Sequence, residues 1–318
     1  MGSRPVLLSV DDAHDGQRLD NCLLTLLKGV PKSHVYKIIR KGEVRINKGR
    51  AKQTTRLKAG DQVRIPPIKL QELASKSVPE SHRALLDAIL FEDDVMMVIN
   101  KPSGFAVHAG SGIRVGVIEA MRSLRSDLPY LELAHRLDRE TSGCLMMAKK
   151  TSALRALNAA FAGSSPGSRR LKKTYLALVK NKFAHGQRVV DKPLDTHARR
   201  GGERHVRISE KGNKASSILR PLGTTRTASF LQIRLRTGRT HQARVHCMAE
   251  GHPIAGDQRY GDREFNLMLR QRYGLNRLFL HASELAFQHP VSEESIVISA
   301  PLPAALQAIL AQLGLGET

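Results

Sequence analysis

The chain has 318 residues, of which 51 are Lys or Arg and 29 are Asp or Glu, so its formal net charge is +22 at neutral pH. Such a surplus of positive charge indicates a polyanionic partner, and nucleic acid is the first candidate. No apolar run approaches the roughly 20 residues that span a bilayer, and the first residues do not resemble a secretory signal. We therefore expect a cytosolic or nuclear protein with no membrane partner.

Three cysteines, Cys22, Cys144 and Cys247, lie far apart and form no CxxC pair, which argues against a disulfide framework or a zinc knuckle. We expect them to be buried as small apolar side chains. Hydrophobic residues make up 41% of the chain, enough for a sizeable core in one large or two unequal domains. Aromatic residues make up only 4%, which argues against a platform that stacks many bases.

Residues 1–16 are expected to form an N-terminal extension or strand, and residues 17–67 a small basic domain. In QRLDNCLLTLLKGV the apolar residues recur at helical spacing, and Gly29 and Pro31 end the predicted helix. KSHVYKIIRKG predicts a second helix that ends at Gly42, and EVRIN and DQVRIP alternate like half-buried strands. The apolar faces of the two helices are expected to be buried: Leu19, Cys22, Leu23, Leu26 and Leu27 in the first, and Val35, Ile38 and Ile39 in the second.

Positive charge is concentrated in this small unit. Residues 1–70 contain 15 Lys and Arg against 6 Asp and Glu, a surplus of nine. Such charge favours contact with backbone phosphates over base reading, although a merely solvated basic surface is the alternative. The segments QRLDNCLLTLL, IIRKGEVRINKGRAK and LKAGDQVRIPP resemble the S4 RNA-binding domain in order and spacing. The resemblance implies RNA contacts by Lys32, Lys37, Arg40, Lys41 and Arg45.

Residues 68–83 are polar and are expected to form a linker to a larger domain, residues 84–318. Strands are predicted at VMMVIN, CLMMAKK, KKTYLALV and SFLQIRLRTG. Helices are predicted at ALRALNAAFA, capped by Thr151 or Ser152, at THQARVHCMAEG and at PLPAALQAILAQLG, whose apolar stripe should pack inward. Because strands outnumber helices and follow one another like hairpins, we predict an α+β fold with a largely antiparallel, mixed sheet flanked by helices.

The stretch AHRLDRETSG places Asp138 in a loop just ahead of a strand. The flanking Arg136 and Arg139 favour the ionised carboxylate, so Asp138 would act as a nucleophile or base rather than as an acid. No second carboxylate stands at a diagnostic spacing. His241 and His246 are five residues apart, which does not fit a metal-binding HExxH helix, so we expect structural histidines. The motifs of phosphate-cradling enzymes and of α/β-hydrolases are absent from the sequence.

HRLDRETSG resembles the defining motif of the RluA-type pseudouridine synthases. Four more blocks, VINKPSGFAVHAGSG, KKTYLALV, TGRTHQARVHCMAEGHPIAGDQRYG and LHASELAFQHP, resemble further motifs of that family in the family's order. The resemblance implies an isomerase that breaks the N1–C1′ bond of a uridine, turns the uracil and joins C5 to C1′. It also implies base flipping and no metal, nucleotide or redox cofactor. One departure is Ala243, where the family usually has Ile or Leu.

The resemblance carries roles to individual residues. Asp138 is implied to be the essential carboxylate, as nucleophile or as base. Arg136 is implied to enter the space that the flipped base vacates, Tyr175 to stack on the uracil, and Arg244 to pair with Asp138. Lys101 and Pro102 are expected to shape the domain.

The combination of an N-terminal S4 domain with these motifs is similar to family members that modify large-subunit ribosomal RNA, so the resemblance implies that substrate and a cytoplasmic location, with a monomer as the default. Related members act on other ribosomal sites or on transfer RNA. A non-catalytic RNA-binding or ribosome-assembly factor is the alternative, disfavoured because Asp138, Tyr175 and Arg244 are all present. The basic segment HARRGGERHVR, residues 197–207, is expected either to touch RNA or to be an idle solvated loop.

Overall fold

The computed structural model describes residues 5–11, 14–27, 30, 32–68, 79–110, 113–163, 171–184, 186–196, 199–200 and 203–316. The chain divides into two compact units, Met1–Ser77 and Val78–Thr318, each described here by itself. Most of the expected linker lies outside the described residues, and its last part contains the short helix α3 (Glu80–Arg83). In the described residues, no helix is long and apolar enough to cross a membrane.

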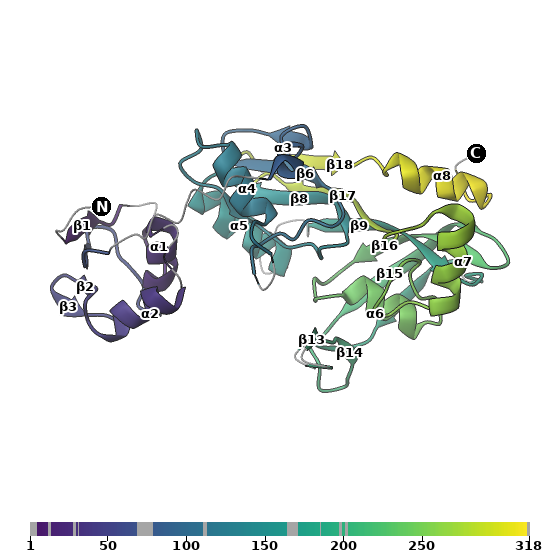
Figure 1. Cartoon of the computed structure of the whole chain (residues 1–318), viewed down its shortest axis with the longest axis horizontal. Coiled ribbons are helices and arrows are strands. Elements are labelled where there is room, and N and C mark those ends of the chain that lie inside the picture. Colours follow the sequence, from purple (N-terminus) through teal and green to yellow (C-terminus); the bar gives the residue numbers. More distant parts are fainter. Residues whose placement is uncertain are drawn as a thin grey trace. The chain divides into compact units, whose positions relative to one another are not determined.

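The N-terminal unit packs two helices against a small sheet (Figure 1). The helices are α1 (Leu19–Leu26) and α2 (Lys32–Arg40), and the sheet has the antiparallel order β1-β4-β2-β3. Its strands are β1 (Val6–Ser9), β2 (Arg45–Ile46), β3 (Gly49–Arg50) and β4 (Gln62–Ile65). Of the side chains expected to be buried, Leu26 is 37% exposed, because Leu27 fills the core side of the last turn instead.

The RLD sequence at the start of α1 ties the two helices of this unit together. Asp20 is only 2% exposed, and its carboxylate accepts hydrogen bonds of 3.1 and 2.8 Å from the Arg18 guanidinium and one of 3.3 Å from the Tyr36 hydroxyl. The hydrogen bonds and charge of Arg18 hold the pKa of Asp20 below its usual value despite its burial. A buried charge is tolerated here because it is paired on several sides.

The larger unit is built on a ten-stranded sheet with the order β10-β15-β16-β9-β17-β8-β6-β5, with β18 beside β17 and β7 beside β8 (Figure 1). Its strands pair antiparallel except β17 with β8, which are parallel. The strands are β5 (Ile89–Glu92), β6 (Met96–Lys101), β7 (Glu132–Leu133), β8 (Ser142–Ala148), β9 (Lys172–Lys180), β10 (Arg188–Asp191), β15 (Ser216–Thr224), β16 (Ala228–Leu235), β17 (Leu280–Gln288) and β18 (Ser295–Ser299). The predicted α+β fold is confirmed.

The helices of this unit are α3, α4 (Val117–Leu124), α5 (Thr151–Ala162), α6 (Gln242–Ala249), α7 (Arg263–Tyr273) and α8 (Ala304–Gln312). Short two-stranded ribbons join β11 (Leu194–Asp195) to β14 (Arg207–Ile208) and β12 (Arg199–Arg200) to β13 (Glu203–Arg204). The predicted cap of α5 is wrong: the N-cap is Lys150, whose extended backbone carries the chain out of β8, so Thr151 is already helical. All three cysteines are free and buried, as expected.

The parallel contact between β8 and β17 fixes where the Asp138 loop enters the sheet. Gly143 opposes Ala282 across this contact, with a φ of 108°. A Cβ at position 143 would lie 2.1 Å from the Ala282 carbonyl oxygen. Only glycine fits such an approach, so the Ser-Gly that follows the loop is a requirement of the sheet.

Candidate active site

All four residues of the HRLD segment line one pocket, and His135 and Leu137 also anchor the segment to the rest of the domain. His135 Nε2 accepts a hydrogen bond of 3.0 Å from the backbone N–H of Met146 in β8, and its ring stacks on Phe161 with centroids 4.5 Å apart. Burial lowers the pKa of His135 to about 3, which keeps the ring neutral. Leu137 is buried in the core, whereas Arg136 is exposed at the pocket and Asp138 lines it.

The Lys-Pro turn after β6 supports the turn that follows Asp138. Lys101 is fully buried, and its Nζ donates to the carbonyl oxygens of Pro102, Phe105 and Arg139 at 2.8, 2.9 and 3.1 Å. Gly104 N–H also donates to the Arg139 carbonyl, at 2.8 Å. Burial lowers the pKa of Lys101 to about 7, while its three acceptors favour the protonated form. Lys101 thus acts as a strut behind the loop and does not reach the pocket.

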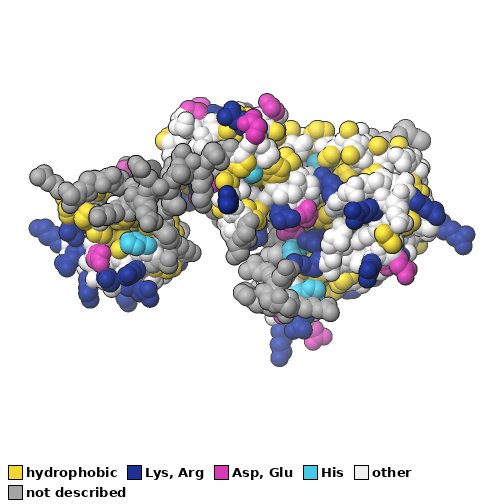
Figure 2. Space-filling view, in the orientation of Figure 1, with side chains coloured by type: hydrophobic (Ala, Val, Ile, Leu, Met, Phe, Trp, Pro, Cys, Tyr) yellow, Lys and Arg dark blue, Asp and Glu magenta, His cyan; other side chains and the backbone are white. Residues whose placement is uncertain are grey.

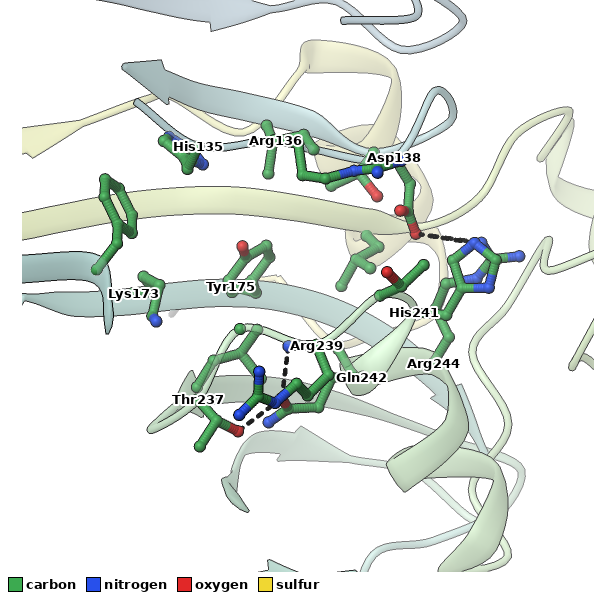
Figure 3. A pocket seen from close by; sticks show the side chains of 18 of the residues that line it. His135, Arg136, Asp138, Lys173, Tyr175, Thr237, Arg239, His241, Gln242 and Arg244 are labelled. Atoms are coloured by element: carbon green, nitrogen blue, oxygen red, sulfur yellow. Dashed lines mark hydrogen bonds and ion pairs between the residues drawn. The ribbon is translucent and has the colours of Figure 1, made fainter. Parts of the chain in front are cut away.

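The carboxylate of Asp138 is held through one of its oxygens. Arg244 Nη1, on α6, donates to Asp138 Oδ2 at 3.2 Å, and His241 Nε2 lies 3.7 Å from the same oxygen (Figure 3). The side chain of Asp138 is 19% exposed. Asp138 lines the pocket, and among the described residues no hydrogen bond to its Oδ1 is present.

Arg244 is itself fixed by Asp257, a residue that the sequence did not single out. Its Nε and Nη2 donate to the two carboxylate oxygens of Asp257 at 2.7 and 2.8 Å, in the bidentate geometry that guanidinium groups favour. Asp257 is fully buried and also accepts backbone hydrogen bonds from Arg259 and Tyr260. Burial disfavours both charges, but their pairing raises the pKa of Arg244 and lowers that of Asp257.

His241, which the sequence predicts to be a structural histidine, is hydrogen-bonded to Tyr260 and also lies beside Asp138. The backbone N–H of Val206 donates to the Tyr260 hydroxyl oxygen at 3.0 Å, so the hydroxyl proton is available to donate to His241 Nδ1, 2.8 Å away. This assigns the remaining ring proton to Nε2, which faces Asp138. Burial lowers the pKa of His241 to about 4, so the ring is neutral near pH 7. Its backbone is left-handed, with a φ of 54°, which is uncommon away from functional sites.

His246, in contrast, is a structural histidine. Its Nδ1 lies 2.9 Å from Ser217 Oγ and its Nε2 lies 3.0 Å from the Lys192 carbonyl oxygen. Within the described part of the chain, no three His, Cys, Asp or Glu side chains cluster as a metal site would require.

Asp138, Arg136, Tyr175 and Arg244 all line one pocket of about 380 Å³, a volume typical of small-ligand sites. Tyr175 projects from β9 and is partly exposed, and burial raises the pKa of its hydroxyl, so the ring stays uncharged. The floor also includes the loop between β16 and α6. There the Gln242 amide accepts from Thr237 Oγ and Arg239 N–H at 2.7 and 3.0 Å, which fixes that loop. Ala243 is buried beside Arg244.

The basic residues expected to bind RNA in the N-terminal unit are exposed: Lys37, Arg40, Lys41 and Arg45. Lys and Arg side chains, drawn dark blue, gather on this unit in Figure 2. Arg45 also donates to the Gly42 and Lys48 carbonyl oxygens, both at 3.3 Å, which orients it. The side chain of Lys32 and much of the basic segment 197–207 lie outside the described residues.

Comparison with known proteins finds two matching families. The one described as RNA pseudouridylate synthase matches residues 95–249, and the one described as S4 domain matches residues 17–63. The chain is 47% identical to ribosomal large subunit pseudouridine synthase C from Escherichia coli strain K12, over 312 residues that cover 97% of this chain and 96% of that protein. It is 48% identical to the protein of the same name from Yersinia pestis, over 300 residues that cover 93% of this chain and 91% of that protein.

A solved structure, human RNA pseudouridylate synthase domain containing 4, is similar with a TM-score of 0.59 and 26% identity. The match covers 74% of this chain and 95% of that chain. The two proteins therefore share a fold over about three quarters of this chain.

Proposed function

We propose, from the premise that this chain belongs to the RNA pseudouridylate synthase family, that it converts uridines of large-subunit ribosomal RNA to pseudouridine with Asp138 as its reacting carboxylate. The observation that carries the residue assignment is the held carboxylate. Asp138 lines the pocket, its Oδ2 accepts a hydrogen bond from Arg244, and Arg244 is held by the buried Asp257. Such fixing of a charged group before the reaction is a main source of enzymatic rate enhancement.

The isomerisation changes no atoms overall. The N1–C1′ bond breaks, a C5–C1′ bond forms, C5 loses a proton and N1 gains one. Asp138 Oδ1 serves this chemistry either by attack on C1′ or as a base at the sugar. Arg244 keeps the carboxylate ionised and oriented in both cases.

The target base must leave its stack before it reaches Asp138, at a cost of a few kcal/mol. Tyr175 offers its ring as the platform for the flipped uracil, a contact worth about 1–3 kcal/mol. Arg136 is exposed at the same pocket, and the described residues provide it with no ion-pair partner, so its guanidinium is free to fill the vacated stack. These two contacts together offset the cost of flipping.

Partners and setting follow from the same premise. The exposed basic residues of the S4 unit are proposed to contact RNA phosphates, which explains why the charge surplus is concentrated there. We propose a monomer that acts where ribosomal RNA is made, in the cytoplasm.

The test compares the wild type, Asp138→Asn and Glu140→Gln on unmodified large-subunit ribosomal RNA. Pseudouridine is mapped by carbodiimide-blocked primer extension. Glu140 is the matched control because it lies in the same turn and pairs with the exposed Arg139 at 2.8 Å. We expect modification by the wild type and Glu140→Gln, and none by Asp138→Asn. Equal modification by all three would refute the role of Asp138, and modification by none would favour a non-catalytic RNA-binding protein.

A further inference from the structure

Lys173 is a buried cation that lines the pocket beside the ring of Phe161. In the view of Figure 3, Tyr175 lies between Lys173 and Asp138. Lys173 is 6% exposed, and the contact recorded for its Nζ is with the ring of Phe161, 5.8 Å from the ring centroid. In the part of the chain that the structure describes, its ammonium group forms no hydrogen bond or ion pair.

Other buried or partly buried lysines of this unit have hydrogen-bond or ion-pair partners. Lys101 donates to three carbonyl oxygens, Lys149 pairs with Glu92 at 2.7 Å, and Lys180 pairs with Asp262 at 2.6 Å. Desolvation makes an unpaired buried ammonium costly, so proteins rarely retain one without a use for it. Burial, and then the nearby Arg239, lower the pKa of Lys173, as expected for a cation that lacks a counter-charge.

Cations dominate the wall around Lys173. Arg236 and Arg239 are exposed on the loop between β16 and α6, and both line the pocket. Arg239 is oriented by two contacts: its Nε donates to the Lys214 carbonyl oxygen at 3.1 Å, and its backbone N–H donates to Gln242. Asp138 is the one carboxylate among the described lining residues, and Arg244 already holds it.

We propose that Lys173 and Arg239 form a subsite for a phosphodiester group that flanks the flipped uridine. This inference rests on the proposed function, because it takes the occupant of the pocket to be a nucleotide of an RNA chain. Lys173 and Tyr175 project from the same face of β9, about 7 Å apart along the strand. The phosphates on either side of the uridine are attached to the ribose whose C1′ meets Asp138. One of them therefore reaches Lys173 while the base lies on Tyr175.

The charge of the wall favours a phosphate over the neutral edge of the uracil. A uracil carbonyl oxygen could accept one hydrogen bond, but because it is neutral it would leave the charges of Lys173 and Arg239 without a counter-charge. A phosphodiester brings the missing negative charge and accepts hydrogen bonds from both side chains. The subsite would thus act on every substrate equally and would hold the nucleotide, leaving the choice of uridine to other contacts.

The experiment is a coupling measurement with full-length protein. Substrate RNA is made with a neutral methylphosphonate at either of the two linkages that flank the target uridine. Dissociation constants are measured for Asp138→Asn, which prevents turnover, with and without Lys173→Met. Lys173→Arg should retain binding. Lys172→Met is the matched control, because Lys172 is exposed on the opposite face of β9.

At one of the two linkages, we expect the methylphosphonate to weaken binding about 10- to 100-fold with Lys173 present. Lys173→Met should weaken binding of unmodified RNA to a similar extent, and the methylphosphonate should then cost little more. If, at each linkage, the methylphosphonate weakens binding by the same factor with and without Lys173→Met, the two effects are independent and the proposal is overturned. Lys172→Met should show the same sensitivity to the methylphosphonate as the parent.

Two readouts separate other outcomes. Lys173→Met should unfold at the same or a higher temperature than the parent, because the substitution removes an unpaired buried charge. A lower unfolding temperature would mean that Lys173 already has a stabilising partner in the free protein, and this would contradict the proposal. The wild type should form pseudouridine on the unmodified RNA. If it does and the two effects are independent at each linkage, the phosphate subsite is wrong while the proposed function stands; if it forms none, the proposed function fails.

Discussion

Asp257→Asn is the sharpest test of how the candidate site is held. The substitution keeps the size of the side chain but removes the charge that both Arg244 nitrogens contact at 2.7 and 2.8 Å. Because Asp257 is fully buried and the Arg244 side chain is 10% exposed, the guanidinium would remain as a buried cation whose one remaining carboxylate partner among the described residues is Asp138. Breaking such a pair from one side costs about 3–5 kcal/mol. For a domain of this size, that loss lowers the melting temperature by roughly 6–20 °C.

Thermal unfolding followed by circular dichroism measures the stability loss. Single-turnover formation of pseudouridine measures the rate. We expect a rate at least about tenfold lower, with RNA affinity nearly unchanged, because Asp138 is still present but poorly oriented. The matched control is Asp262→Asn, since Asp262 pairs with Lys180 at 2.6 Å but is 30% exposed, and Asn can replace it as the N-cap of α7. That variant should lose less than about 1 kcal/mol of unfolding free energy. Its activity should equal that of the wild type.

A second variant separates charge from packing. Arg244→Met combined with Asp257→Asn removes both charges, so stability should recover relative to Asp257→Asn while activity stays low. If Asp257→Asn melts and reacts like the wild type, the buried pair does not hold Asp138, and the reasoning from its geometry is refuted.

Three further expectations concern other parts of the chain. Lys101→Met removes the Nζ donor from the Pro102 and Phe105 carbonyl oxygens and leaves that of Arg139 with the Gly104 N–H alone, so it should destabilise the protein by about 2–5 kcal/mol in denaturant titrations. A loss below about 1 kcal/mol would mean that Lys101 does not support this turn. Replacement of exposed Lys37, Arg40 and Lys41 by alanine should leave the melting temperature unchanged and lower the salt slope of RNA binding by about 2–3, and an unchanged slope would place the phosphate contacts elsewhere. The pKa of His135 is lowered to about 3 in the folded state, so below pH 6.5 only the unfolded state gains its proton and stability falls. Between pH 7 and pH 5 the wild type should lose about 2 kcal/mol more than His135→Gln, and equal losses would show that this ring is not buried neutral.

The fold class, the order of the main elements and the family can all be predicted from the amino-acid sequence. Alternating and helical apolar patterns are local properties of the chain, so the strands at β6, β8, β9 and β16 and the helices at α5, α6 and α8 were predicted near their observed positions. The family motifs HRLDRETSG and KKTYLALV point to Asp138 and Tyr175. The RLD sequence at Asp20 belonged to the S4 resemblance, but its role as a buried ion-pair centre between two helices became visible only in the structure.

The contacts that hold the site could not be predicted from the sequence, because they join segments that are far apart in the chain. Asp257 reaches Arg244 across 13 residues, and Arg244 reaches Asp138 across 106. No local pattern marks a carboxylate that will be buried beneath a guanidinium. For the same reason, the sequence predicts His241 only as a structural histidine and marks no role for Lys173 in its strand. Burial and pairing are properties of the assembled sheet. They distinguish Lys173, which is buried and lines the pocket, from its neighbour Lys172, which is exposed to solvent.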